Sequence, residues 1–407
     1  MDSLAPLTEK QKKNFIILSA FMIFMVMSAS DIYISSLPNM VRIFHTTASV
    51  MNLTLSGYMF GMAFGFLFAG EISNYFGRRK TLLIALLLFS VSSFLIAAVH
   101  SIWAIIFFRV IQAFGSAAVI IVCRLVFNDT MDSKEQINAN GLMQVGLILS
   151  PALAPVIGAY LDKYFGWESC FFFSGCVSAV LLFISFRSLQ ETNQTPIKNF
   201  DSIFHYLNSY GKLAINRLFL SYTLVYSMGG SVYYSFLGIS PYLFIDKWHI
   251  PQEIYSYLYI ALSAAFLVGN YVMRTLNSRN VDPDKLISAG VYATLCGSVL
   301  CITALFTEWQ VAAIIIVCGV AFIRMANALI SAPTQVKIMV YFQSEGALAT
   351  GLNMSVAFLF SSVALSVVSF FDAVPLRGLI GVGLVFALLC LASSKLKGPR
   401  QGAEVAK

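Results

Sequence analysis

A series of long apolar segments constrains this chain more than any other feature of its sequence. An α-helix rises about 1.5 Å per residue, so about 20 apolar residues span the roughly 30 Å hydrocarbon core of a bilayer. Twelve segments of about this length are found at residues 15–37, 48–72, 81–99, 102–127, 137–161, 168–188, 215–240, 253–273, 285–306, 310–333, 346–371 and 375–394. The sequence therefore predicts an all-α membrane protein with 12 transmembrane helices.

Composition and charge agree with this class. Hydrophobic residues make up 58% of the chain and charged residues only 11%, against about 25% in soluble proteins. Most of the 26 lysines and arginines lie at the termini or in loops on the same side, while the opposite loops hold Arg42, Lys163, Lys247 and Arg377. The positive-inside rule then predicts that both termini are cytoplasmic. This orientation signal explains the net charge of +7, which indicates no nucleic-acid partner.

A polar linker divides the chain. The sequence predicts an N-terminal six-helix half at residues 1–190, a cytoplasmic linker at 191–214 and a C-terminal six-helix half at 215–407. Within the linker, four apolar residues recur at helical spacing and predict a short helix on the cytoplasmic membrane surface: Phe200, Ile203, Phe204 and Leu207. Two six-helix halves with a binding site near the bilayer midplane are typical of transporters.

Two predicted spans carry residues that interrupt helices. The fifth contains Pro151 and Pro155, and the seventh contains Gly229 and Gly230. Backbone breaks persist at membrane depth only where protein or a cavity satisfies the freed polar groups. We therefore expect these two helices to line a cavity. Pro151 and Pro155 also predict a bend, which could serve packing or form a seal between the two halves.

The loop after the second span, GEISNYFGRRKTLLI at residues 70–84, carries the strongest local signature. It resembles the cytoplasmic loop motif of the major facilitator superfamily, G-x-L-x-D-x-x-G-R-R/K. The matching residues are Gly70, Gly77, Arg78, Arg79 and Lys80, whereas Asn74 stands where that family usually has Asp. Three basic residues alone could be a topology signal, but the glycine spacing favours the family.

Two further stretches strengthen the resemblance. RVIQAFGSAA in the fourth span resembles the family's R-x-x-Q-G-x-G element through Arg109, Gln112 and Gly115, with Ala113 in place of the first Gly. GLILSPALAPVIGAYL in the fifth resembles the antiporter motif, and its residues are Gly146, Pro151, Pro155 and Gly158. These prolines look most like the Bcr/CflA branch of drug:proton antiporters.

The resemblance has definite implications. It implies a major facilitator fold in a bacterial cytoplasmic (inner) membrane and a monomeric, multi-pass exporter of small molecules. It implies that a proton gradient drives transport and that no cofactor is needed. It also implies that Arg78 contacts Asp129 at the end of the fourth span, a latch that Asn74 would weaken by removing one charge.

Asp31 is the carboxylate that lies deepest within a predicted span. A charge in that position is costly, so it is functional by default and needs a partner. We expect Arg109 to be that partner, with Gln112 on the same helix face three residues on. A carboxyl group that alternates between an apolar environment and an arginine can take up and release a proton. Alternatively, Asp31 lies near the outer end of its helix, is wetted by water and merely caps it.

The candidate substrate cavity is aromatic and weakly polar. Its residues are Tyr33, Gln112, Tyr226, Tyr234, Arg324, Asn327 and Asn353. Such a surface suits bulky amphipathic molecules, although tyrosines in membrane helices are commonly interface anchors. Arg324 has no carboxylate in its own span. It could attract an anionic substrate, snorkel toward the cytoplasm or pair with a carbonyl.

Several motifs are absent, which narrows the function. The four histidines lie in predicted loops, and the seven cysteines form no C-x-x-C pair, so no metal site is expected. The sequence lacks Walker A, H-E-x-x-H and G-x-S-x-G motifs, so it predicts no enzyme. We therefore expect a proton-coupled exporter of amphipathic molecules. The alternative is a dedicated exporter of one endogenous metabolite, such as a siderophore or amino-acid derivative; a membrane-embedded enzyme or receptor is a weaker third possibility.

Overall fold

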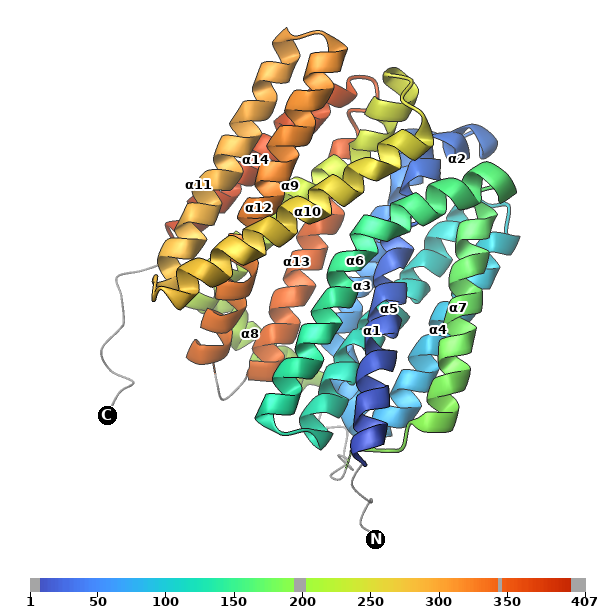
Figure 1. Ribbon diagram of the computed structural model, residues 1–407, viewed down its shortest axis with the longest axis vertical. Helices are drawn as coiled ribbons and strands as arrows, with labels where there is room; N and C mark the ends of the chain where they lie inside the picture. The colour runs from blue at the N-terminus through green and yellow to red at the C-terminus, as the bar shows by residue number, and fades with distance from the viewer. Residues whose placement is uncertain (1–7, 194–202, 343–345, 397–407) are drawn as a thin grey trace. The chain divides into compact units, whose positions relative to one another are not determined.

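The computed structural model describes residues 8–193, 203–342 and 346–396, and among these only helices and connecting turns occur (Figure 1). The helices are α1 Glu9–Asp31, α2 Leu37–Ile43, α3 Ala48–Phe76, α4 Arg78–Ala98, α5 Ile102–Thr130, α6 Ser133–Phe165, α7 Glu168–Ser188, α8 Ile203–Ile215, α9 Arg217–Pro241, α10 Gln252–Ser278, α11 Pro283–Ile302, α12 Trp309–Tyr341, α13 Gly346–Ser369 and α14 Pro375–Ser394. Short 3-10 turns follow α1 and α11, and a π-helical turn, Tyr242–Lys247, follows α9. The all-α prediction is confirmed.

Eleven helices in the described part of the chain are long and apolar enough to cross a membrane. They correspond to eleven of the predicted segments. The remaining segment, 215–240, forms α9, whose many serines, tyrosines and glycines lower its hydropathy. Gly229 and Gly230 do not interrupt α9, and Pro151 lies within a continuous α6. The residues expected to break these two helices therefore lie inside continuous helices.

The first span differs from its prediction as a single helix over 15–37. Helix α1 ends at Asp31, and a 3-10 turn and α2 follow. The backbone at Tyr33 has left the helical region, with φ −110° and ψ 6°. Pro38 lies in the first turn of α2, where its missing N–H costs nothing. Asp31 is therefore the last residue of a helix that ends inside the apolar segment.

Contacts divide the chain into two compact units. Unit 1 contains residues 1–200 and 241–263, and unit 2 contains 201–240 and 264–407. In unit 1, α3 packs along α5, α4 packs against α5 and α7, and α1 packs against α6 (Figure 1). In unit 2, α11 packs along α12 and α14. The predicted six-helix halves, 1–190 and 215–407, remain a prediction about the path of the chain through the membrane.

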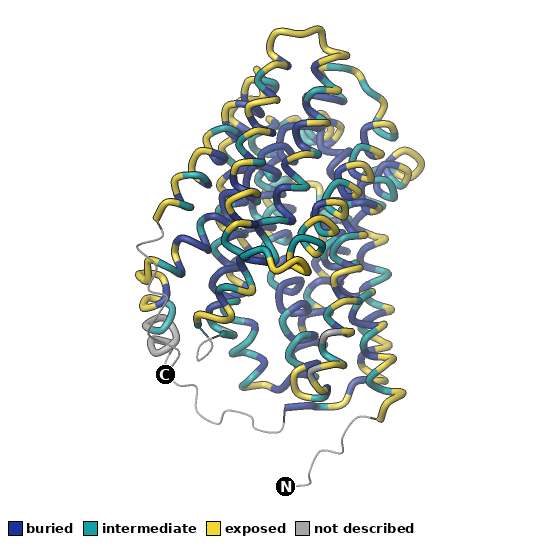
Figure 2. Tube along the Cα trace, turned by 60° about the vertical axis from the view of Figure 1, so that its left-hand side comes forward, coloured by how far each residue is buried: buried dark blue, intermediate teal, exposed yellow. Residues whose placement is uncertain are grey.

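Large apolar side chains are exposed along the helices, as a bilayer requires. Phe107 of α5 is 61% exposed, Phe183 of α7 is 59% exposed and Ile314 of α12 is 64% exposed. Exposed and buried residues alternate around the helices of each unit (Figure 2). In water such surfaces would favour aggregation, whereas lipid tails solvate them without penalty.

The predicted linker helix is present as α8, Ile203–Ile215, which contacts α13. Phe200 lies outside the described residues. His205 belongs to α8, so the expectation that all four histidines lie in loops is wrong for this one. The reason is the helical spacing of the apolar residues around it, which extends the helix through the polar linker.

Small residues, Gly61 and Gly65 among them, allow α3 and α5 to approach closely. A Cβ on Gly61 would collide with the Val110 carbonyl oxygen and lie 2.9 Å from Ala113 Cβ. A Cβ on Gly65 would lie 2.5 Å from Ala117 Cβ. Close helix packing of this kind is a main source of stability inside a membrane, where burial of apolar surface contributes little.

Substitution of Gly61 tests this packing. We expect Gly61→Ala to destabilise the protein by about 1–3 kcal/mol, because a backbone oxygen cannot move aside without shifting the helix. The control is Gly381→Ala in α14, where a Cβ would meet nothing within 4 Å. Thermal unfolding in detergent should show a lower midpoint for the first variant and an equal or higher one for the second. Equal midpoints for both variants would contradict the contact.

Candidate functional site

Asp31 lies in a buried environment at the broken end of α1. Its side chain is 8% exposed, and the Ser30 hydroxyl donates to Oδ1 at 3.1 Å. The burial argues against the alternative in which Asp31 is a wetted cap. A helix that ends in a buried position leaves carbonyl groups without intrahelical partners, so other groups must satisfy them.

Arg109 of α5 satisfies one of these carbonyls. Its side chain is fully buried, and its Nη1 donates to Ala29 O at 2.9 Å and to Gln112 Oε1 at 2.6 Å. Its Nε donates to Thr54 O of α3 at 3.3 Å. The carbonyl end of a helix carries a partial negative charge, so the last turn of α1 stabilises the guanidinium.

Aromatic rings complete the surroundings of Arg109. The guanidinium carbon lies 4.1 Å from the ring centroid of Tyr58 and 4.8 Å from that of Tyr33. Such cation–π contacts are strongest where water is excluded. Ala29, whose carbonyl Arg109 binds, lies two residues before Asp31 in α1. The structure thus brings the two residues predicted for proton coupling into one buried site within unit 1.

Hydrogen bonds fix the remaining polar groups of this site. The Tyr33 hydroxyl lies 2.8 Å from Thr54 Oγ1, and Gln112 Nε2 donates to Ser93 Oγ at 2.7 Å. Arg109 Nη2 has no hydrogen-bond partner among the described residues. Sequence reasoning missed Thr54 and Ser93, which belong to no motif and become relevant only through packing. Nη2 of Arg109 is therefore available to bind a further group.

Unit 2 holds the other candidate cavity residues. The guanidinium carbon of Arg324 in α12 lies over the rings of Tyr233 and Phe266, 4.1 and 4.7 Å from their centroids. Of the tyrosines predicted for this cavity, the Tyr226 hydroxyl contacts Met354 Sδ at 3.8 Å, and the Tyr234 ring packs edge-on against Tyr233. Of the three possibilities raised for Arg324, pairing with a carbonyl is not found among the described residues.

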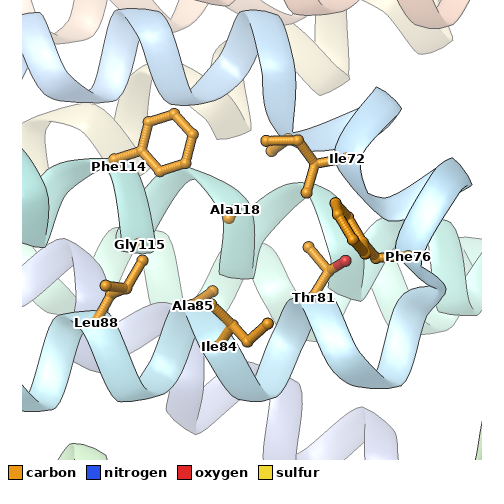
Figure 3. A pocket seen from close by; sticks show the side chains of 10 residues that line it. Ile72, Phe76, Thr81, Ile84, Ala85, Leu88, Phe114, Gly115 and Ala118 are labelled. Carbon is orange, nitrogen blue, oxygen red and sulfur yellow. The ribbon is translucent and has the colours of Figure 1, made fainter. Parts of the chain in front are cut away.

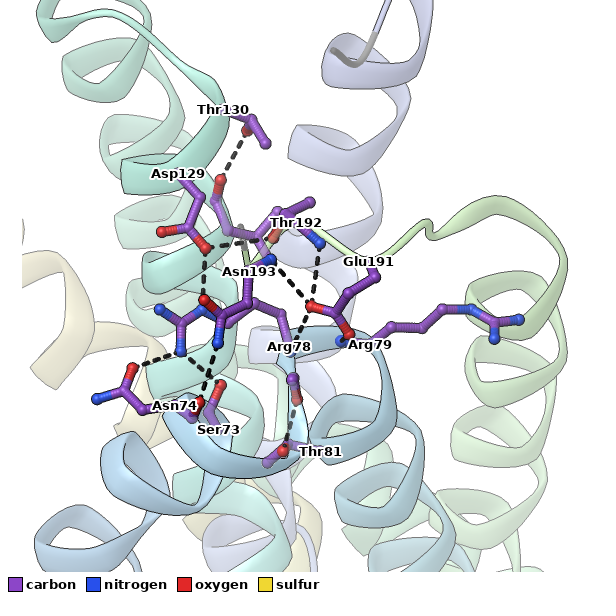
Figure 4. Close-up of polar contacts among 12 residues, drawn as sticks. Ser73, Asn74, Arg78, Arg79, Thr81, Asp129, Thr130, Glu191, Thr192 and Asn193 are labelled. Carbon is purple, nitrogen blue, oxygen red and sulfur yellow. Dashed lines mark hydrogen bonds and ion pairs between the residues drawn. The ribbon is translucent and has the colours of Figure 1, made fainter. Parts of the chain in front are cut away.

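The loop motif forms a polar cluster at the ends of α3, α4 and α5 (Figure 4). Gly77 has φ +93°, a conformation that favours glycine, and it turns the chain from α3 into α4. Arg78 is 7% exposed, and its Nε donates to Asp129 Oδ2 at 2.9 Å. The contact predicted between these two residues is present. Lys80 is exposed, and a Cβ on Gly70 would meet nothing within 4 Å, so packing in this structure does not require that glycine.

Asn74 has a specific environment in this cluster. Its Oδ1 accepts from Arg78 Nη1 at 2.6 Å, while its Nδ2 faces Glu71 Oε2 at 3.5 Å. An amide can serve both neighbours, whereas a carboxylate would be repelled by Glu71. Asn74 therefore keeps a contact with Arg78 at the position where the family usually has Asp, but it carries no negative charge.

Glu191 is a member of the cluster that sequence reasoning missed. Its carboxylate accepts from the backbone N–H groups of Arg78 at 2.8 Å and Arg79 at 3.2 Å, which begin α4. It also accepts from the N–H groups of Thr192 and Asn193, at 3.0 Å each. A carboxylate at a helix N-terminus satisfies orphan donors and complements the helix dipole. Glu191 thus ties the start of the linker to the loop motif.

Removing the charge of Glu191 should loosen the start of α4. We expect Glu191→Gln to reduce hydrogen-exchange protection at residues 78–80 roughly tenfold, because a charged cap of this kind contributes about 1–2 kcal/mol. Exchange measured by mass spectrometry on the purified protein checks this. The control is Glu308→Gln, which precedes α12 and makes no side-chain cap. Unchanged protection at 78–80 would show that other contacts hold the turn.

A second charged cluster lies in unit 2 and was also missed. Lys337 of α12 donates to Asp284 Oδ2 at 3.0 Å and lies 3.7 Å from Asp282 Oδ1. The Tyr222 hydroxyl donates to Asp284 Oδ1 at 2.8 Å. The acidic residues stand at the start of α11 and the basic residue near the end of α12. This arrangement reverses the charges of the Arg78–Asp129 pair, which joins the start of α4 to the end of α5.

The antiporter motif lies where α6 meets α1. A Cβ on Gly146 would lie 2.7 Å from Ala20 O, and one on Gly158 would collide with the carbonyl oxygen of Ile32. Gly158 therefore packs directly against the broken segment after Asp31. Close backbone approach, which only glycine permits, explains this part of the motif.

A separate pocket of about 230 Å³ lies among α3, α4 and α5 (Figure 3). It is lined by Ala69, Ile72, Phe76, Thr81, Ile84, Ala85, Leu88, Phe114, Gly115 and Ala118. None of these residues carries a charge, and none was predicted for the substrate cavity. Among the described residues, no group of three or more histidine, cysteine or acidic side chains could hold a metal ion.

Membrane-length helices with a buried arginine and carboxylate in their interior are typical of multi-pass membrane transporters. The family model described as Major Facilitator Superfamily matches residues 18–365. The chain therefore belongs to the major facilitator superfamily and is a membrane transporter acting on small molecules.

Relatives and solved structures agree with this family. An uncharacterised transporter of Rickettsia bellii is 28% identical over 68% of this chain and 69% of its own length. Multidrug resistance protein MdtL of Klebsiella pneumoniae is 24% identical over 65% and 69%. A bacterial homologue of the human lysosomal transporter Spinster has a TM-score of 0.73 at 11% identity over 96% and 97% of the two chains. The xylose transporter XylE of E. coli has a TM-score of 0.72 at 12% identity over 95% and 97%.

Proposed function

We propose that this protein exports amphipathic small molecules across the bacterial cytoplasmic membrane by proton-coupled alternating access. The observation that carries the proposal is the burial of Asp31 beside Arg109 at the broken end of α1. The similarity to MdtL, a multidrug resistance protein, supports export. The paired prolines of α6 favour the Bcr/CflA branch within the family. Both termini lie in the cytoplasm in this proposal, and the monomer is the working unit.

The site suggests how a proton is held and released. When Asp31 is ionised, its charge and the carbonyl end of α1 together offset the charge of Arg109. When Asp31 is protonated, Arg109 keeps the carbonyl of Ala29 and the tyrosine rings but loses the ionic contribution. In the cycle that we propose, Asp31 is protonated from outside and the substrate competes with or displaces that proton from the cytoplasmic side.

The other predicted residues receive proposed roles. Tyr33 and Gln112 hold the geometry around Arg109, and the polar residues of unit 2 contact the substrate. The loop motif and its partner Asp129 stabilise one conformation of the cycle through the Arg78 contact. The Lys337–Asp284 pair stabilises the corresponding helix ends in unit 2. The glycines and prolines of α6 allow α1 and α6 to move while staying in contact.

Export of one endogenous metabolite is the second candidate. The observation that favours it is Arg324, a cation inside α12 without an ion-pair partner among the described residues. A fixed cation with open hydrogen-bonding positions selects for a particular head group, whereas a multidrug pump gains from few such constraints.

Transport in proteoliposomes tests the proposed function. The purified protein is reconstituted into liposomes that contain a pH-sensitive dye, and amphipathic cations, neutral compounds and carboxylates are added in turn. We expect at least one class to cause proton movement that requires the protein. We also expect an imposed pH gradient to drive uphill accumulation that an uncoupler abolishes. Accumulation that ignores the pH gradient would refute proton coupling, and no transport of any class would refute the exporter.

A further inference from the structure

We propose that unit 2 contains a binding site for a carboxylate that carries a neighbouring hydrogen-bond donor, so that the exported molecule is an amphipathic organic acid of this kind. The inference rests on the proposed transport function and names the head group of its substrate. The residues that form the site are Arg324 and Asn327 of α12 and Asn353 of α13.

Arg324 is positioned to receive an anion. Its guanidinium carbon lies over the ring of Tyr233 and over the ring of Phe266, 4.1 and 4.7 Å from their centroids. Stacking leaves the N–H groups at the edge, which is the part that binds carboxylates in a two-pronged geometry. Arg324 makes no hydrogen bond or ion pair with the described residues, and its buried Nε has no partner. The rings thus pre-orient a cation whose donors remain available.

Two asparagine side chains are also buried without partners. Asn353 is 1% exposed, and neither its Oδ1 nor its Nδ2 has a hydrogen-bond partner in the described part of the chain. Asn327 is 8% exposed, and its Oδ1 has no partner. Leaving a buried amide unsatisfied costs about 1–3 kcal/mol, so such groups call for a ligand or ordered water.

Helix α9 shows that these residues share one region. Along α9, Tyr226 contacts Met354, which follows Asn353, and Gly229 lies beside Asn327, since a Cβ there would be 3.6 Å from Asn327 Oδ1. Tyr233 stacks on Arg324. Positions 226, 229 and 233 have the i, i+3, i+7 spacing of a single helix face and span about 10 Å at the helical rise. Arg324 and Asn327 are themselves three residues apart on α12.

The chemistry of these groups specifies the ligand. One guanidinium matches one negative charge, which favours a carboxylate over a doubly charged phosphate. Each amide offers an NH2 group that donates and a carbonyl oxygen that accepts. The donors supplement Arg324 on the carboxylate, while the acceptors require an N–H or O–H group beside it. The surrounding tyrosines and Met354 provide apolar surface for the rest of an amphipathic molecule.

Matched pairs of probes test the head group. The full-length protein in lipid nanodiscs is titrated at pH 7 with N-acetylalanine, N-acetylleucine and N-acetyltryptophan and with the corresponding neutral carboxamides. We expect the acid to bind at least about tenfold more tightly than its amide in at least one pair, the size of a charge-assisted hydrogen bond. Arg324→Gln should reduce this ratio to about one. The matched control, Arg279→Gln, changes an exposed arginine and should leave the ratio unchanged.

A second variant separates binding from folding. Asn353→Leu keeps the branching of the side chain at Cγ but removes a buried unsatisfied amide, so we expect weaker acid binding together with an equal or higher unfolding temperature. A structural role for Asn353 would instead lower that temperature. The proposal is overturned if no pair favours the acid or if Arg324→Gln keeps the preference. Transport of cations or neutral compounds without acid preference would overturn this inference alone, whereas absence of all transport would overturn the proposed function.

Discussion

Asp31→Asn should abolish uphill transport while sparing substrate exchange. The substitution keeps the size of the side chain and its ability to accept from Ser30, but it removes the carboxylate that we propose binds the proton. In proteoliposomes we expect accumulation driven by a pH gradient to fall to the level of protein-free vesicles. Exchange of labelled for unlabelled substrate should continue, because exchange needs no net proton movement.

The control for this result is Asp372→Asn. Asp372 is an exposed residue between α13 and α14, so the same chemical change should leave gradient-driven transport within about twofold of the unmodified protein. Intact proton coupling in Asp31→Asn would remove Asp31 from the mechanism. Loss of exchange as well as coupling would show that the carboxylate is needed for substrate binding or for the conformational change.

Arg109→Gln should destabilise the protein and stop transport together. The substitution removes the donors to Ala29 O and Thr54 O and leaves the carbonyl of Ala29, at the end of α1, without this partner. It also leaves the buried carboxylate of Asp31 without the nearby positive charge. Removing one member of a buried charged group typically costs about 3–5 kcal/mol. A lower thermal unfolding midpoint in detergent and loss of both uphill transport and exchange are the expected measurements.

Two further variants serve as comparisons for Arg109→Gln. Arg274→Gln changes an exposed arginine of α10 and should alter stability by less than about 0.5 kcal/mol. Arg109→Lys keeps the charge but cannot donate to three acceptors in the fixed geometry of a guanidinium. We expect it to be intermediate in stability. A stable and fully active Arg109→Gln protein would show that the α1 carbonyls need no partner and that Arg109 has no part in coupling.

Local signals in the sequence predicted most of the fold. Apolar segments of membrane length located eleven membrane-length helices, because hydropathy averaged over 20 residues does not depend on tertiary contacts. The loop motif predicted the Arg78–Asp129 contact through family resemblance.

The sequence predicted which charged residues belong to the candidate site but not the backbone geometry around them. Asp31, Arg109 and Arg324 were apparent from the sequence because charges are rare in apolar segments. The end of α1 at Asp31 was not apparent, since nothing in an apolar stretch marks where its backbone leaves the helix. Glu191 was missed because acidic residues in polar linkers are common and carry no motif.

The sequence alone determined that this protein lies in a lipid bilayer, where its helices are and which family it belongs to. It also identified the few charged residues within apolar segments. Each of these conclusions depends on residue type and local spacing. The tertiary structure decided which groups those charges meet. Arg109 binds the carbonyl of Ala29 in the last turn of α1, close to the point where Gly158 of α6 packs against Ile32. Arg324 lies over the rings of Tyr233 and Phe266, which come from two other helices. Contacts of this kind join residues far apart in the chain, so helix packing determines them and local sequence does not.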